Sequence, residues 1–108
     1  MQARIDRHTI RIYDGRVSGI GSPGAAQSAL TVGAVDGADE RAYFQDMGPR
    51  LGDAVVKPEI VAPGVDVLAA RSSASDGDGP YVSLSGTSMA TPHVAGAAAI
   101  IAQQHPDW

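Results

Sequence analysis

The chain has 108 residues, a length that suits one domain with a modest hydrophobic core. Hydrophobic residues make up 44% of the sequence and charged residues 19%, and this balance argues against intrinsic disorder. The net charge of −4 comes without any cluster of lysine or arginine, so we expect no nucleic-acid partner.

Other classes of protein are excluded by what the sequence lacks. The absence of cysteine removes disulfides, thiolate metal sites and cysteine nucleophiles. No apolar run follows the N-terminal charges, so we expect no signal peptide in this stretch, and the small apolar run at 97–102 is too short to span a membrane. The carboxylates of Asp76 and Asp78 supply far fewer than the six or more oxygen ligands that calcium takes. We therefore expect no membrane partner, no metal and no cofactor.

Residues 1–19 form an unassigned N-terminal segment in our division of the chain, and residues 20–108 form the rest. Ile10 and Ile12 alternate with polar neighbours before Asp14-Gly15, a pattern typical of a β-hairpin. The glycines and proline of 20–24 then indicate a loop.

Short apolar runs further along the chain predict strands. The run at 29–35 has no polar face, as expected of a strand buried on both sides in a parallel sheet. Similar but shorter runs predict strands at 60–62, 65–70 and 81–84. Between them, 43–53 and the polar, glycine-rich 72–80 are predicted to be surface loops.

The last element is a predicted helix over 87–104, which ends before His105-Pro106. It is apolar nearly all round, and a helix without a polar face belongs inside a protein. So few residues can hardly surround such a helix. We therefore expect that the chain is part of something larger or needs a partner.

Ser88 stands where a predicted strand and a tight turn lead into this helix. The first N–H groups of a helix lack partners inside it and carry the positive end of its dipole, which suits an anion. Acyl transfer needs an attacking oxygen beside such donors. Serine is also a common helix N-cap, and by spacing alone an ordinary cap is the more frequent role.

The sequence around this serine favours the chemical role. The stretch 86–96, Gly-Thr-Ser-Met-Ala-Thr-Pro-His-Val-Ala-Gly, resembles the nucleophile signature of the subtilisin-like serine proteases over its full length. The resemblance implies that Ser88 is the acylated nucleophile and that its backbone N–H is an oxyanion donor. It also implies that Thr87 supports the oxyanion site.

The resemblance extends upstream. The stretch 20–36 is similar to the family segment beside the primary specificity pocket, and 57–67 is similar to the stretch that precedes the serine. This implies that Ser22, Pro23 and Gly24 line part of the substrate pocket. It also implies a partial α/β fold of the subtilisin type, with a mainly parallel sheet and a buried helix that begins at the serine. Residues 43–49 depart from the family's serine-rich form.

The other catalytic groups of the family are not identifiable in this chain. The family's triad runs Asp, His, Ser, but the only upstream pair, Asp6 and His8, has no family-like context. His93 lies roughly 140° around the helix from Ser88, which predicts a packing role, and His105 suits a C-terminal cap. The family's second oxyanion donor is an asparagine, and the chain contains none. We expect negligible proteolysis by this chain alone.

Two functions therefore remain open. The first is a serine endopeptidase that acts on peptides or proteins when completed by an N-terminal portion that supplies the base, and secretion is implied only by family analogy. The second is a non-catalytic, truncated module of the same family. An exposed sheet edge would then favour self-association or the binding of a complementary fragment.

Overall fold

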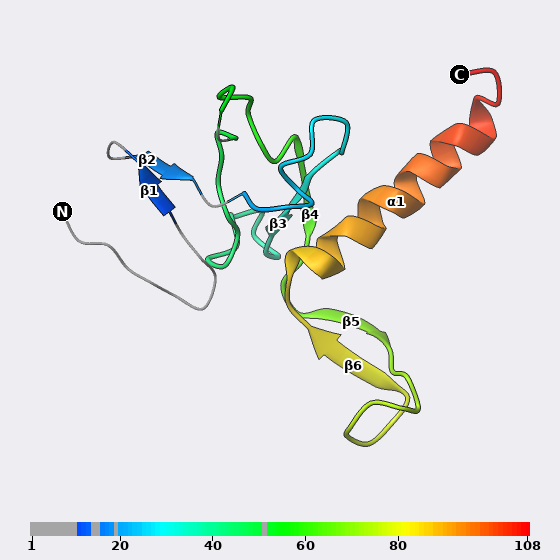
Figure 1. The fold of residues 1–108 in the computed structure, drawn as a ribbon. Helices are drawn as coiled ribbons and strands as arrows, with labels where there is room; N and C mark the ends of the chain where they lie inside the picture. Colours follow the sequence, from blue (N-terminus) through cyan, green and yellow to red (C-terminus); the bar gives the residue numbers. More distant parts are fainter. Residues whose placement is uncertain (1–10, 14–15, 19, 51) are drawn as a thin grey trace.

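A computed structural model describes residues 11–13, 16–18, 20–50 and 52–108, with side chains described from residue 20 onward. The described residues contain six strands and one helix (Figure 1). In chain order these are β1 Arg11–Tyr13, β2 Arg16–Ser18, β3 Val32–Val35, β4 Ile60–Pro63, β5 Val67–Ala70, β6 Tyr81–Leu84 and α1 Thr87–Gln104.

Strands β1 and β2 pair antiparallel, with Ile12 opposite Val17. These are the two limbs of the hairpin expected from the alternating pattern. The Asp14-Gly15 turn between them lies outside the described residues.

Strands β3 and β4 form the parallel pair that the apolar runs predict. Val32 lies opposite Ile60, and Val35 opposite Pro63. Positions 33–35 are buried, as expected of a strand covered on both faces. Helix α1 begins against this pair, which makes the arrangement a partial α/β fold of the expected kind.

The core between these elements is built almost entirely from alanine. Ala34 of β3, Ala42, Ala62 of β4 and Ala90 of α1 are buried together. Four larger side chains pack around them: Val32, Phe44, Val65 and Val94. Small side chains let the helix approach the two strands closely, so the first turns of α1 are the best-packed part of that helix.

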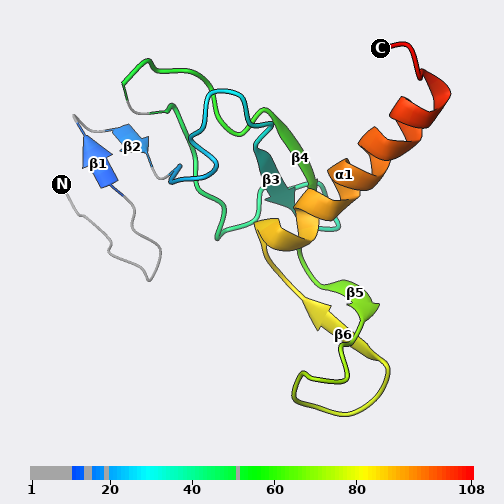
Figure 2. The same cartoon turned by 45° about the vertical axis from the view of Figure 1, so that its right-hand side comes forward.

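Strands β5 and β6 form an antiparallel hairpin, with Val67 opposite Leu84 and Ala70 opposite Tyr81. The hairpin projects away from β3 and β4 on one side of the helix start, and α1 runs away on the other (Figures 1 and 2). Its tip, 72–80, is the exposed loop that its composition predicts. The Arg71 guanidinium spans this loop by donating to the carbonyls of Asp76 and Tyr81.

Helix α1 occupies the predicted range, but most of it is not buried. Ala90 is its one buried residue, while Ile100 and Ile101 are 59% and 49% exposed. The apolar sequence led us to expect an enclosed helix, yet the described elements cover only its first turns (Figures 1 and 2). His105 is the C-cap, as predicted, and its backbone N–H donates to the carbonyl of Ile101. No helix in the described part of the chain is long and apolar enough to cross a bilayer.

Candidate active site

Ser88 is the second residue of helix α1 and is not its cap. The N-cap is Gly86, and no side chain caps the helix. The Ser88 side chain is exposed, and its hydroxyl makes no hydrogen bond to any described residue. The ordinary capping role considered for this serine is therefore wrong, and its hydroxyl remains available for chemistry.

The backbone around Ser88 presents hydrogen-bond donors. The N–H groups of Met89 and Ala90 donate to the Gly86 carbonyl. The N–H groups of Thr87 and Ser88 come before the first hydrogen bonds of the helix, and no described group accepts a hydrogen bond from them. The first turn also contains no acidic residue to neutralise the positive end of the helix dipole. A developing negative charge beside Ser88 would thus meet the unpaired Ser88 N–H and a favourable field.

The start of the helix is fastened to the sheet through Gly64, which follows β4. Gly64 N–H donates to the Val35 carbonyl at 2.9 Å, and Gly86 N–H donates to the Gly64 carbonyl at 2.7 Å. A Cβ at Gly64 would lie 2.7 Å from the Ala34 Cβ and 2.8 Å from the Gly86 oxygen. These distances are too short for a side chain, so glycine is what lets the strand end meet the helix start.

A second link closes the base of the hairpin beside Gly86. The backbone N–H of Asp66 donates to the Ser85 Oγ at 2.8 Å, and the Ser85 hydroxyl donates to the Asp66 carboxylate at 3.3 Å. Asp66 has a left-handed backbone, with φ of 52°. The two contacts tie the residue before Gly86 to the start of the hairpin.

The histidine of the motif does not pack as expected. His93 is exposed, and its Nδ1 lies 2.8 Å from the Met89 carbonyl one turn earlier. A carbonyl only accepts, so Nδ1 is the ring nitrogen that carries the proton in this contact. The ring therefore bonds to the helix backbone, and the predicted packing role is wrong.

Residues from the two halves of the resemblance meet at one pocket, whose volume is about 760 Å³. Ser22, Pro23 and Gly24 lie in its lining together with Thr87 and Ser88. The 20–24 loop and the helix start are more than sixty residues apart in the sequence. The pocket thus brings together the predicted nucleophile, its neighbour Thr87 and the three predicted substrate-binding residues.

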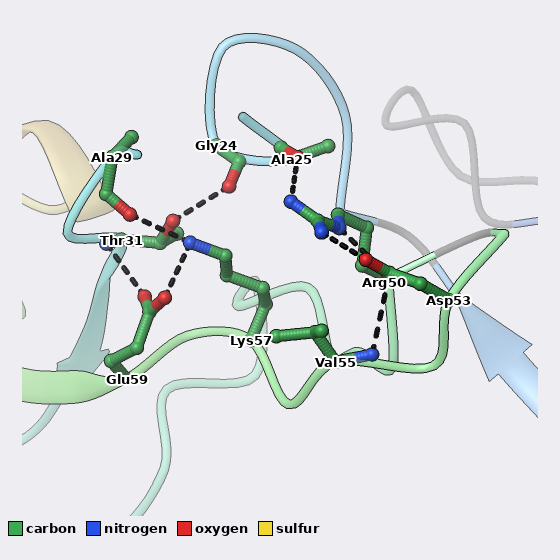
Figure 3. A network of polar contacts seen from close by, with 9 residues as sticks. All are labelled: Gly24, Ala25, Ala29, Thr31, Arg50, Asp53, Val55, Lys57 and Glu59. Atoms are coloured by element: carbon green, nitrogen blue, oxygen red, sulfur yellow. Dashed lines mark hydrogen bonds and ion pairs between the residues drawn. The ribbon is translucent and has the colours of Figure 1, made fainter. Parts of the chain in front are cut away.

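A polar network holds the pocket loop in place (Figure 3). The Thr31 hydroxyl donates to the Gly24 carbonyl at 2.6 Å, and the Thr31 backbone N–H donates to the Glu59 carboxylate at 2.8 Å. Lys57 forms an ion pair with Glu59 and also donates to the Ala29 carbonyl at 2.6 Å. The Lys57 hydrogen bond, followed by that of Thr31, lowers the pKa of the Glu59 carboxyl below its usual value. Sequence reasoning missed this network.

A second anchor comes from Arg50, which donates to the Ala25 carbonyl at 3.1 Å and pairs with Asp53 (Figure 3). The Arg50 hydrogen bond is the main cause that lowers the pKa of the Asp53 carboxyl to about 2. The same pairing raises the pKa of the arginine. The 20–31 segment is therefore held at both Ala25 and Ala29, from two different parts of the chain.

Gln45 is a further pocket residue that the sequence did not single out. The residue is 9% exposed, and its Oε1 accepts from the backbone N–H of Ala34 at 2.6 Å. The amide lies against Gly33, where a Cβ would come within 2.7 Å of it. One sign in the sequence marks this segment as unusual, because residues 43–49 depart from the family's serine-rich form. That departure did not indicate a role for Gln45.

Two further observations concern groups that the sequence analysis considered and set aside. Asp6 and His8 lie outside the described residues. Within the ranges that the structure describes, no three His, Asp or Glu side chains gather in a way that could hold a metal ion.

Comparison with known proteins agrees with the fold. The profile of the Subtilase family matches residues 13–108. The chain is 44% identical to a subtilisin of Bacillus pumilus over 94 residues, which are 87% of this chain and 30% of that protein. It is 43% identical to subtilisin E of Bacillus subtilis over 94 residues, covering 22% of that protein. A subtilisin-like protease of Arabidopsis thaliana, SBT3.10, is 48% identical over 68 residues, which are 62% of this chain and 9% of that protein.

The chain therefore belongs to the subtilase family, and it spans less than a third of the length of each of these relatives. The family match begins at residue 13, inside the N-terminal segment that our division left unassigned.

Proposed function

We propose that this chain carries the nucleophile and part of the substrate pocket of a serine endopeptidase. The observation that carries the proposal is the Ser88 hydroxyl, exposed and without a hydrogen bond at the first turn of α1, in one pocket with the 22–24 loop. The relatives are named as subtilisins and as a subtilisin-like protease, which supports the same reaction.

The reaction that fits this geometry is acyl transfer. Ser88 Oγ attacks the carbonyl carbon of a peptide bound in the pocket while a base removes the hydroxyl proton. The carbonyl oxygen becomes an oxyanion, which the Ser88 N–H and the dipole of α1 stabilise. Collapse of this intermediate, with a proton returned to the leaving amine, produces an acyl-enzyme on Ser88, and water then hydrolyses it.

The base and a second oxyanion donor must be supplied by groups other than those described. The imidazole of His93 is bonded to its own helix, and that of His105 stacks on Trp108 at the far end of α1. The chain contains no asparagine that could donate to an oxyanion. Without such a base and donor we expect the chain to cleave peptides negligibly.

A fluorophosphonate tests this proposal, because it phosphonylates an activated serine and the adduct is visible in the intact mass. We would treat the chain alone, and also the chain fused after the part of the Bacillus pumilus subtilisin that precedes its matched region. The fusion should gain one adduct, and its Ser88→Ala variant should gain none. A folded fusion that stays unlabelled would refute the role of Ser88, and an adduct on the chain alone would refute the need for an outside base.

A non-catalytic module is the second candidate, and the exposed apolar surface of α1 favours it. Ile100 and Ile101 would each be stabilised by burial against another protein surface. Sedimentation velocity across a range of concentrations separates the two. A chain that self-associates and also stays unlabelled in the fusion would support this candidate over the enzyme.

A further inference from the structure

Gln45 holds a fixed position in the substrate pocket. It is nine-tenths buried, and it lines the pocket together with Phe44 and with Val32 and Gly33 of β3. Its carboxamide reaches β3 because Gly33 has no side chain in the space that the amide occupies. A residue buried to this extent and bonded to a strand has one orientation, which is the condition for specific recognition.

The orientation of the carboxamide follows from its partner. The backbone N–H of Ala34 can only donate, so the side-chain atom 2.6 Å away must be the Gln45 oxygen. The other end of the amide is then the NH₂ group, with two hydrogens to donate. The nitrogen of this NH₂ group makes no hydrogen bond to another described residue. In the described part of the chain, every fully buried side-chain nitrogen or oxygen has a hydrogen-bond partner. The unpaired nitrogen of Gln45 is therefore accessible to solvent.

We propose that the Gln45 NH₂ group is a specificity-determining donor, which binds a hydrogen-bond acceptor on the substrate side chain held in this pocket. Once a substrate side chain fills the pocket and displaces solvent from the NH₂ group, leaving that group unpaired is costly, so a substrate that pairs with it gains over one that cannot. The lining has apolar residues at Ile20, Pro23 and Val32 and one carboxylate at Asp46. The carboxylate disfavours an anionic substrate side chain, which leaves an uncharged one with a terminal carbonyl as the match for the NH₂ group. The preferred side chain is therefore that of glutamine, ahead of methionine, which has similar size and no such acceptor.

This inference rests on the proposed function, but its test needs binding and no turnover. The probes are two peptides, acetyl-Ala-Ala-Gln-Ala-amide and acetyl-Ala-Ala-Met-Ala-amide, titrated into the ¹⁵N-labelled 108-residue chain and followed by NMR. The sequence has five glutamines and no asparagine, so the side-chain amide region holds few signals. We expect the glutamine peptide to bind about twofold to tenfold more tightly than the methionine peptide, and to shift the Gln45 NH₂ signals.

The diagnostic variant is Gln45→Glu, which keeps an oxygen for the Ala34 N–H and replaces the NH₂ group by a second oxygen. It should abolish the preference for the glutamine peptide and gain affinity for the matching lysine peptide. Gln27→Glu is the matched control, because it makes the same change at an exposed residue that does not line the pocket. It should retain the preference of the parent chain.

Equal binding of the two peptides by the parent chain, or no binding of either, would overturn the role of Gln45. So would a preference that survives in folded Gln45→Glu. If that variant does not fold, the test is the chemical shift of the Gln45 NH₂ signals in the parent chain. A glutamine peptide that binds without shifting these signals also overturns the role of Gln45. The fluorophosphonate experiment does not depend on which peptide binds, so a failure of the acyl chemistry is seen there separately.

Discussion

The clearest test of how the structure positions Ser88 is a pair of identical substitutions, Gly64→Ala and Gly96→Ala, which should change stability in opposite directions. At Gly64 a new methyl group would lie 2.7 Å from the Ala34 Cβ, 2.8 Å from the Gly86 oxygen and 3.3 Å from the Ala90 Cβ. At Gly96, inside α1, it would meet no atom within 4 Å.

The magnitudes follow from these distances. Carbon atoms normally sit about 3.5–4.0 Å apart, so at Gly64 a strand or the helix start must move by most of an ångström. Overpacking of this kind costs about 1–3 kcal/mol of the free energy of unfolding. At Gly96 the only change is in helix propensity, where alanine is better than glycine by about 0.8–1.0 kcal/mol. The two variants should therefore differ by about 2–4 kcal/mol.

Urea denaturation followed by circular dichroism measures this difference. For an m-value of about 2 kcal/mol/M, Gly64→Ala should lower the midpoint by about 0.5–1.5 M, and Gly96→Ala should raise it by nearly 0.5 M. A Gly64→Ala chain as stable as the parent would show that the contact between β4 and the helix start is not close. Midpoints that move together in the two variants would refute the distinction that the structure makes between the two glycines.

Three other predictions concern the anchors around the pocket. Thr31→Val should cost about 0.5–1.5 kcal/mol of the free energy of unfolding in the same urea assay, while Thr31→Ser should restore most of it, since the hydroxyl carries the contact. The Asp53 carboxyl should titrate near its pKa of about 2 by NMR, and in Arg50→Gln it should return toward 3.8. Because the folded state lowers this pKa, the stability due to the pair is complete above about pH 4 and is lost as the pH falls toward 2. Ser85→Ala should speed hydrogen exchange at the Asp66 amide, which loses its acceptor, and an unchanged rate would contradict that bond.

Much of the fold could be predicted because its signals are local. The helix over 87–104 was predicted to the residue, since a long run of helix formers begins after a glycine turn and ends before a proline. The strand at 60–63 and its parallel partner were likewise marked by short apolar runs. Within the described residues only the start of α1 is buried, which agrees with the expectation that so few residues can hardly surround this helix. An apolar helix sequence shows that burial is tolerated, but burial itself depends on what surrounds the helix.

The site was predicted in part, for a reason that can be traced to residue types. Ser88 and Ser22 belong to stretches whose turns need glycine and proline at particular positions. These residues make both stretches recognisable in the sequence. Lys57 and Thr31 act through side chains that reach carbonyls 28 and 7 residues away, and no local pattern reports such a contact. Gln45 needs the missing side chain of Gly33, twelve positions earlier, before its amide can fit.

The nucleophile and the pocket loop are therefore held by different kinds of contact, and this has a mechanistic consequence. The helix start is fixed by backbone groups of Gly64 and Gly86, which have no rotamers and leave little freedom to the Ser88 N–H. The pocket loop is held by the side chains of Thr31 and Lys57, which bond to the carbonyls of Gly24 and Ala29. Under the proposed function, substitutions in these side chains would therefore act first on the pocket loop and only indirectly on the helix start. Substrate preference would then be able to change independently of Ser88.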